Sequence, residues 1–267
     1  MTVRRRILFL LGQSPGTGSV LPGVNALLRQ TGAVANVHVW EGHLPNLTGW
    51  DLVALRGLPV EALEQVNRLE QAGLRCCNSA AATLLVRDKA ATVAFLAAAG
   101  IPVPGSIQVS NWVEAHRVAA GRPVVAKSVY GSRGDGVLLA DREPLPGDPP
   151  FPGPYLIQDL VEGSGPDRKV YVVGEHVAGV LRPWPPDGLD QKRGVSFTPS
   201  EEERDLAVRS GVALGLEVYG VDFRSGPQGS VVVDVNAFPG FKGVHDAGPW
   251  LAAHLLAAVD VMQGSPL

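Results

Sequence analysis

Two aspartates and one asparagine occupy neighbouring Val-rich segments in the last quarter of the sequence. Asp222 lies in YGVDFRSG, and Asp234 and Asn236 lie in VVVDVNAF. The residues between these segments, SGPQGS, are typical of a turn. A hairpin centred near Gln228 would place Asp222 opposite Asp234, and Asn236 would project from the same face as Asp234. Opposed carboxylates repel each other, and a hard divalent cation such as Mg²⁺ would offset that repulsion.

A solvated strand face is the alternative setting for the two aspartates. The surrounding valines argue against it, since Val231, Val233 and Val235 are expected to bury one face of their strand. The Phe-Pro-Gly sequence that follows predicts a sharp turn. Gly240 and Gly243 would allow the backbone there to approach a ligand closely.

A lysine and a glycine-rich segment could bind the phosphates of a nucleotide. Lys127 ends the apolar segment VVAKS, and GSRGDG follows at residues 131–136. Glycines would let this loop fold over phosphates and present backbone N–H groups, with an ordinary hairpin turn as the alternative. The sequence contains no GK[ST] and therefore no Walker A loop. A second glycine-rich segment, GQSPGTG at residues 12–18, is either a ligand loop after the first strand or a turn.

Two further segments could contact a nucleotide. Lys89, in the sequence RDK, is a second candidate for phosphate binding, although a helix-surface lysine is more often solvated. The segment QDLVE at residues 158–162 ends an apolar strand, and its backbone could meet the edge of an adenine ring.

Composition and charge limit the classes of partner. The net charge of −3 argues against a general nucleic-acid or membrane-surface binder. No apolar run approaches the roughly 18 residues that span a bilayer, and the basic, apolar start lacks a leader cleavage site. The adjacent cysteines Cys76 and Cys77 predict no disulfide framework and favour a cytoplasmic protein. The six histidines lack the spacing of a zinc site.

The order of elements predicts the fold class. Strand-like and helix-like segments alternate over residues 1–78, which indicates a small α/β unit with a parallel sheet. An Ala-rich segment at residues 80–99 predicts two helices, the second capped by Asp88. After it, predicted strands and helices alternate without a visible internal repeat. Capping boxes are expected at Asn111/Glu114 and at Ser200/Glu203.

Taken together, these segments resemble the ATP-grasp superfamily, and RimK-like ligases in particular. The resemblance covers roughly residues 75–250 and rests on the sequences RDK, VVAKSVYGSRGDGV, LIQDLVEG, PDRKVYVVGEHVAGVLRPW and GVDFRSGPQGSVVVDVNAFPGFKGV, in that order. It implies an α/β (α+β) ATP-grasp fold, in which a small Rossmann-like parallel sheet precedes two α+β subdomains that clasp ATP. The implied domains are residues 1–78, before the ATP-grasp unit, and residues 79–267. Within the latter, the lid subdomain would be about residues 103–157 and the metal-binding subdomain about residues 158–267.

The resemblance also implies a role for individual residues. Phosphate and nucleotide binding would fall to Lys89, Lys127, Ser132, Arg133 and Gly134, to the adenine-binding segment Gln158, Asp159, Leu160 and Val161, and to Asp167 near the sugar. Lys169 and Arg182 would bind phosphate or stabilise charge in the transition state. Asp222, Asp234 and Asn236 would hold Mg²⁺, with two ions expected and Mn²⁺ as an alternative. Arg193 is a further catalytic candidate, and with Arg133, Lys192, Lys242 and His245 it could surround an anionic substrate.

Some positions depart from the ligase pattern. Asp234 stands where these ligases usually have Glu, and Lys169 stands where they often have Arg, whose fork binds carboxylates and phosphates bidentately. The sequences KVYVVG and NAFPG look closer to ATP-grasp inositol-polyphosphate kinases, whereas the loop at residues 132–136 looks like the ligases.

The resemblance leaves three functions open. The first is a ligase that joins small-molecule acids and amines through an acylphosphate. The second is a small-molecule kinase, and the third is a non-catalytic nucleotide-binding protein. Neither a nucleic acid nor a membrane is expected as a partner, and a homo-oligomer is compatible with the resemblance.

Overall fold

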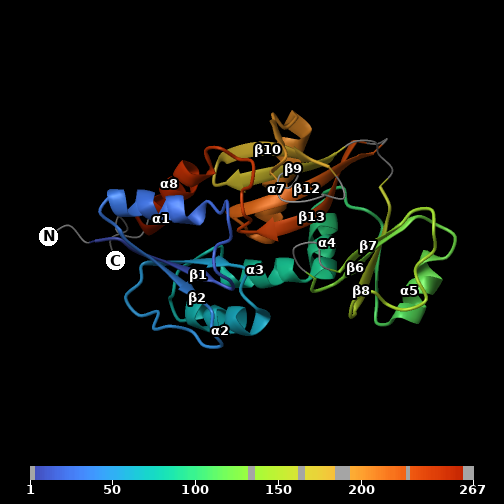
Figure 1. The fold of residues 1–267 in the computed structure, drawn as a ribbon, viewed down its shortest axis with the longest axis horizontal. Coiled ribbons are helices and arrows are strands. Elements are labelled where there is room, and N and C mark those ends of the chain that lie inside the picture. The colour runs from blue at the N-terminus through green and yellow to red at the C-terminus, as the bar shows by residue number, and fades with distance from the viewer. Residues whose placement is uncertain (1–3, 132–135, 162–165, 184–192, 227–228, 261–267) are drawn as a thin grey trace.

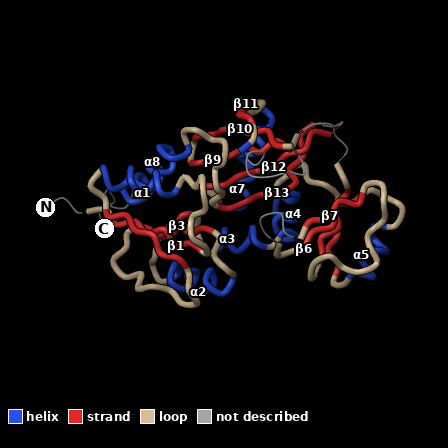
Figure 2. The backbone as a smooth tube through the Cα atoms, in the orientation of Figure 1, coloured by secondary structure: helices blue, strands red, loops and turns tan. Residues whose placement is uncertain are grey.

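The computed structural model describes residues 4–131, 136–161, 166–183, 193–226 and 229–260, which form three sheets with helices packed on them (Figure 1). The N-terminal sheet has four strands, the middle sheet has four and the C-terminal sheet has five. The middle sheet lies at one end of the molecule, and the other two lie side by side at the opposite end (Figure 2). Within the described residues, no helix is long and apolar enough to cross a membrane.

The N-terminal sheet is parallel, as the alternation of elements predicts. Its order is β2-β1-β3-β4, formed by β1 (Arg6–Leu11), β2 (Val34–Val39), β3 (Leu52–Arg56) and β4 (Cys76–Cys77). Successive residues of β1 face opposite sides. Phe9 packs towards α1 (Leu21–Gln30), whereas Leu8 and Leu10 pack towards α2 (Val60–Gln71). This period of two places apolar cores on both faces of the sheet.

Two consecutive helices lead out of this sheet. Ser79 caps α3 (Ala80–Arg87) by accepting from the Ala82 N–H, and Asp88 caps α4 (Lys89–Ala98) by accepting from the Ala91 N–H. The Asp88 cap confirms the expected break in the Ala-rich segment. It also places Lys89 in the first turn of α4.

The middle sheet is antiparallel, with the order β5-β8-β6-β7. Its strands are β5 (Ser106–Val109), β6 (Val124–Ser128), β7 (Val137–Ala140) and β8 (Tyr155–Asp159). Helix α5 (Trp112–Ala119) covers it, and Asn111 caps that helix by accepting from the Glu114 N–H. The expected capping box is wrong here, because the Glu114 carboxylate accepts from the Ser110 N–H instead of from Asn111.

The C-terminal sheet is antiparallel and carries the acidic hairpin. Its order is β11-β10-β9-β12-β13, formed by β9 (Asp167–Val173), β10 (His176–Arg182), β11 (Val195–Phe197), β12 (Val218–Gly226) and β13 (Gly229–Ala237). Helix α7 (Glu201–Leu214) begins with the expected Ser200/Glu203 capping box and ends at Gly215, whose φ of 67° is left-handed.

A β-bulge in the hairpin determines which residues face each other. Near the turn, Phe223 pairs with Val232, but the next pair is Asp222 with Asp234, so Val233 is the extra residue. The expected burial of Val231 and Val233 is therefore wrong. Instead, Val232 and Val235 are buried against α7 and its neighbours.

The N-terminal and C-terminal sheets share one apolar core. Helix α8 (Ala247–Asp260) lies beside α1 in Figure 1 and inserts Leu251 and Leu255 among buried residues from both sheets. The same core includes Phe9 of β1 and Tyr171 of β9. The N-terminal sheet is thereby packed directly against the part of the chain that carries the acidic hairpin.

Candidate functional site

The acidic hairpin has the arrangement that the sequence predicts. Asp222 of β12 lies directly opposite Asp234 of β13. The Asn236 side chain lies on the same face, and its Nδ2 contacts Asp222 Oδ2 at 3.3 Å and Asp234 Oδ2 at 3.2 Å. Two carboxylates and an amide therefore converge on one point of the sheet. Oxygen donors of these types suit a hard divalent cation.

Lys169, on the neighbouring strand β9, partly neutralises this acidic pair. It pairs with Asp222 in the sheet, and its Nζ lies 2.7 Å from both carboxylate oxygens. Lys169 is buried, and burial alone would lower its pKa, but the Asp222 carboxylate and Tyr171 together outweigh that effect and raise the pKa. The lysine is therefore held in its charged form beside the candidate metal ligands.

Lys127 approaches the hairpin from the middle sheet. Its Nζ donates to the carbonyl oxygen of Val233 at 2.8 Å, and Val233 is the bulged residue. The bulge takes this residue out of the cross-strand register, and Lys127 binds its carbonyl. Burial lowers the pKa of Lys127, and the nearby Asp234 carboxylate opposes that shift.

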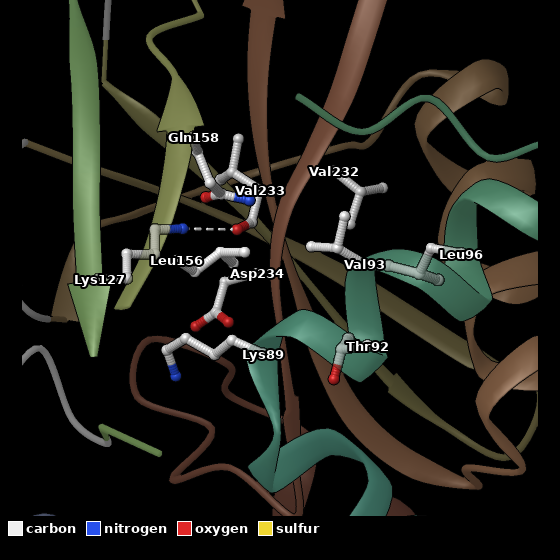
Figure 3. Close-up of a pocket in the computed structure, with 10 residues that line it drawn as sticks. All are labelled: Lys89, Thr92, Val93, Leu96, Lys127, Leu156, Gln158, Val232, Val233 and Asp234. Carbon is white, nitrogen blue, oxygen red and sulfur yellow. Dashed lines mark hydrogen bonds between the residues drawn. The ribbon is translucent and has the colours of Figure 1, made fainter. Parts of the chain in front are cut away.

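Lys89 reaches the same place from the N-terminus of α4. Its Nζ donates to the carbonyl oxygen of Gly131 at 2.7 Å, where the glycine-rich segment begins. Figure 3 shows the Asp234 carboxylate between the side chains of Lys127 and Lys89. Burial acts to raise the pKa of Asp234, but the charges of the surrounding lysines, Lys89 first, outweigh it, so the pKa is lowered.

A small pocket lies between the middle sheet, α4 and the hairpin (Figure 3). Among the described residues, the charged side chains in its lining are those of Lys89, Lys127 and Asp234. Apolar side chains from α4, β8 and β13 form most of the rest. The pocket therefore joins an apolar surface to a charged end. An aromatic base attached to a phosphate chain has the same division into apolar and charged parts.

The expected adenine-binding segment lies along the edge of this pocket. Gln158 of β8 lines the pocket, is buried and donates from Nε2 to Ser106 Oγ at 3.0 Å. Asp159 forms an ion pair with Arg122, and the N–H of Leu160 donates to the Pro123 carbonyl. The backbone N–H of Leu160 is therefore already used within the protein.

The remaining expected residues lie on the C-terminal sheet. Asp167 of β9 accepts from Arg224 Nη1 at 2.8 Å, and burial raises its pKa. Arg182, at the end of β10, donates to the Tyr171 hydroxyl and, from Nη2, to the Lys242 carbonyl at 3.1 Å. Arg193 is exposed. Ser132, Arg133, Gly134 and Lys192 lie outside the described residues.

Three features of the site are not foreseen from the sequence. The first is the carbonyl of the bulged residue Val233, which accepts from Lys127. The second is Tyr171, whose ring lies beneath both Arg182 and Lys169. The third is Arg56 of the N-terminal sheet. It donates to Oγ of Ser19, the residue directly after the glycine-rich segment at 12–18. Its position at the carboxyl end of a parallel strand is the one signal that could have indicated it.

Comparisons with known proteins agree with this geometry. Residues 86–259 match the RimK-like ATP-grasp domain. A protein of Haemophilus influenzae (strain Rd) named "Probable alpha-L-glutamate ligase" is 30% identical over 211 residues, which cover 73% of this chain and 70% of the relative. A protein of the same name from Stenotrophomonas maltophilia (strain K279a) is 29% identical over 239 residues, 81% of each chain.

Solved structures with the same fold include a synthetase and an ATP-grasp ligase. D-cycloserine synthetase DcsG superposes with a TM-score of 0.74 at 19% identity, covering 95% of this chain and 99% of that chain. The ATP-grasp ligase PsnB, complexed with a minimal precursor, Mg and ADP, superposes with a TM-score of 0.70 at 22% identity, covering 97% and 99%. These likenesses confirm the expected mixed α/β fold, with one parallel and two antiparallel sheets.

Proposed function

Because this chain belongs to the RimK-like ATP-grasp family, it is an ATP-dependent carboxylate–amine ligase, and we propose that it attaches L-glutamate to a carboxylate acceptor. The family uses ATP and Mg²⁺. The choice of L-glutamate rests on the names of the relatives in Haemophilus influenzae and Stenotrophomonas maltophilia. The observation that carries the proposal is the convergence of Asp222, Asp234 and Asn236 on one face of the hairpin. Lys127 and Lys89 lie on either side of the Asp234 carboxylate (Figure 3).

Nucleotide binding is assigned to the space between the middle sheet and the hairpin. The apolar lining from α4 and β8 would contact the adenine, with Gln158 at its edge. Lys127 and Lys89 would bind the phosphate oxygens. Both lysines now donate to carbonyl oxygens, of Val233 and Gly131, and these bonds hold the ammonium groups in place for a phosphate. The Asp167 carboxylate would lie near the sugar.

The donor set fits Mg²⁺. Asp222 and Asp234 offer carboxylate oxygens, and Asn236 offers an amide oxygen once its NH₂ group no longer bridges the two carboxylates. When bound there, the metal would neutralise charge on the phosphates of ATP. Two ions would accord with two carboxylates facing a triphosphate.

The chemistry then follows from how the chain positions charge. The γ-phosphoryl group passes to the substrate carboxylate, which gives an acylphosphate and ADP. The amine attacks the acyl carbon, the C–N bond forms, phosphate leaves, and the amine loses a proton. Lys169 and Arg182 would stabilise the negative charge that develops on the transferring groups, and Arg193 would help to hold the acid. The protein supplies orientation and charge and needs no covalent nucleophile.

A substrate screen that scores ADP and free phosphate separately tests this proposal. L-glutamate is combined with a panel of carboxylic acids and peptides, with ATP and Mg²⁺ present. A ligase releases one free phosphate for each ADP and forms an amide-linked product. ADP production with the phosphate retained on an alcohol product would indicate a kinase. Nucleotide binding without any ADP would indicate a non-catalytic protein.

A further inference from the structure

Arg56 connects the N-terminal sheet to the loop that follows the acidic hairpin. It ends β3, and its Nη1 donates to Ser19 Oγ at 3.3 Å. A Cβ built on Gly240 would lie 3.3 Å from Arg56 Nη2. Gly240 belongs to the Phe-Pro-Gly turn, four residues after Asn236. The guanidinium of Arg56 is therefore placed between the loop before α1 and the turn beyond the candidate metal ligands.

The charge of Arg56 has no counter-ion among the described residues. The ion pairs found there do not include Arg56, and the one hydrogen bond described for its side chain goes to a neutral hydroxyl. Arg56 is nevertheless partly buried, and burial lowers its pKa without an opposing carboxylate. A partly desolvated cation without a paired anion is costly. A bound anion would remove that cost.

A second guanidinium reaches the same turn from the C-terminal sheet. Arg182 Nη2 donates to the Lys242 carbonyl at 3.1 Å, two residues beyond the glycine that Arg56 approaches. Its Nε is buried and lacks a hydrogen-bond partner within the described part of the chain. Two arginines thus flank the 238–243 turn, and each retains donor capacity there. A guanidinium presents N–H groups in a fork that matches a carboxylate.

Gly18 and Arg193 extend this cationic region. A Cβ built on Gly18 would lie 3.6 Å from Arg193 Nη2. The backbone of Arg193 also packs on Gly243, where a Cβ would lie 2.0 Å from the Arg193 carbonyl oxygen. The loop before α1, the end of β3 and the 238–243 turn therefore meet at a place with three arginines. None of these arginines lines the pocket that contains Lys89 and Lys127.

We propose that Arg56, with the hydroxyl of Ser19, binds a carboxylate of the amino-acid substrate that is not consumed in the reaction. The site takes a free carboxylate on an amino acid or a peptide. This assignment rests on the proposed ligase function and gives the N-terminal sheet a part in substrate selection. Arg56 is a specificity-determining residue that contacts substrate, and Arg182 remains with the reacting groups.

The test compares carboxylates with their amides. Phosphate release is measured against the concentration of L-glutamate, of L-glutamine and of glutamate α-amide, for the wild type and for Arg56→Met and Arg56→Lys. We expect Arg56→Met to raise the half-saturating L-glutamate concentration roughly 10- to 100-fold, which is what one charged hydrogen-bonded pair contributes. One of the two amides, the one that lacks the anchoring carboxylate, is expected to be as poor a substrate for the wild type as for Arg56→Met.

The controls separate substrate binding from structural damage. Arg68→Met, on the exposed side of α2, should match the wild type in every measurement. ATP affinity should be unchanged in Arg56→Met, and thermal stability should not fall, because the substitution removes a partly buried charge that lacks a counter-ion among the described residues. Arg56→Lys should recover part of the lost affinity. An equal loss for L-glutamate and for both amides would overturn the assignment.

Failure of the proposed function has a different signature. If the wild type releases no phosphate with any acid and amine pair, glutarate is titrated calorimetrically into protein loaded with Mg²⁺ and a non-hydrolysable ATP analogue. Binding by the wild type and by Arg68→Met, and loss of binding in Arg56→Met, would support the carboxylate site independently of turnover. Equal binding by all three proteins, or none by the wild type, would overturn it.

Discussion

The ammonium group of Lys169 lies 2.7 Å from each carboxylate oxygen of Asp222, on strands that pair directly in the C-terminal sheet. The Asp222 carboxylate also contacts the Asn236 amide. A divalent ion on this hairpin would have to share Asp222 with Lys169. The lysine therefore has two opposed effects, since it competes for a metal ligand and adds positive charge where the phosphoryl group is transferred.

Replacing Lys169 by Met should separate these effects. We expect the half-saturating Mg²⁺ concentration to fall, because Asp222 loses its competing cation. The rate of phosphate release should fall about 100-fold, because a charge that stabilises the transition state is lost. Steady-state assays over a Mg²⁺ series give both values. Lys169→Arg keeps the charge and should retain most of the rate, and an unchanged rate in Lys169→Met would contradict the role assigned to this lysine.

Asp234→Asn should abolish Mg²⁺-dependent turnover and leave the fold intact. The substitution keeps the shape of the side chain, so the fold should form, but the lysines that lower the pKa of Asp234 lose a counter-charge, and the melting temperature should fall slightly. Far-UV circular dichroism, a melting curve and the phosphate assay decide the outcome. Asp205→Asn, on the exposed side of α7, is the matched control and should behave as the wild type. Full turnover by Asp234→Asn would refute the metal assignment.

Lys127→Met should weaken ATP binding selectively. Met fills a similar volume but cannot donate to the Val233 carbonyl or to a phosphate. We expect the half-saturating ATP concentration to rise roughly 10- to 100-fold, with little change in that of L-glutamate. Nucleotide titration followed by fluorescence provides a measurement independent of turnover. Arg117→Met, exposed on α5, serves as the control. A parallel loss of affinity for both substrates would point to a misplaced sheet instead of a lost phosphate contact.

The Arg168–Glu203 pair gives a prediction for the pH dependence of stability. Glu203 is buried and accepts from Arg168 Nη2 at 3.0 Å. Burial acts to raise the pKa of Glu203, but the Arg168 hydrogen bond, with those of the capping box, outweighs it and lowers the pKa. The carboxylate therefore stabilises the fold fully above its unfolded pKa of about 4.3, and this contribution is lost as the pH falls through the lower folded pKa.

The corresponding variant is Glu203→Gln. It should lower the free energy of unfolding by about 2 kcal/mol at pH 7. The difference from the wild type should shrink in acid and disappear once the pH is below the lowered folded pKa of Glu203. Urea unfolding at a series of pH values measures both. Glu201→Gln, at an exposed position in the same first turn, should show a much smaller effect at every pH.

Much of the fold could be predicted because local signals agree with the tertiary structure. The Asp88 cap, the Ser200/Glu203 box and the parallel N-terminal sheet all follow from residue patterns. The short edge strands β5 and β11 could not be predicted, because their pairing depends on neighbours distant in sequence. The Asp222–Asp234 register is correct for an incomplete reason. The sequence suggests a simple hairpin, whereas the observed register includes the Val233 bulge.

The candidate site likewise contains some residues that sequence patterns indicate and others whose contacts they do not. The hairpin acids and Lys127 are local features of strands, so sequence patterns indicate them. The partnership of Lys169 with Asp222 and the position of Arg56 beside Gly240 arise only when separate segments pack together. A lone arginine at a strand end carries no sign of burial in its sequence neighbourhood. The roles assigned to all these residues stay predictions.

Helix α8 packs against both the N-terminal and the C-terminal sheets, which has a consequence for truncating this enzyme. Leu251 and Leu255 contact apolar residues contributed by the first 78 positions as well as by the hairpin side. Removing residues 1–78 would expose the apolar face of α8 to solvent. The remaining part of the chain should therefore aggregate instead of forming a soluble enzyme. Conversely, substitutions at the positions of α8 that contact both sheets would destabilise the N-terminal segment and the hairpin side together.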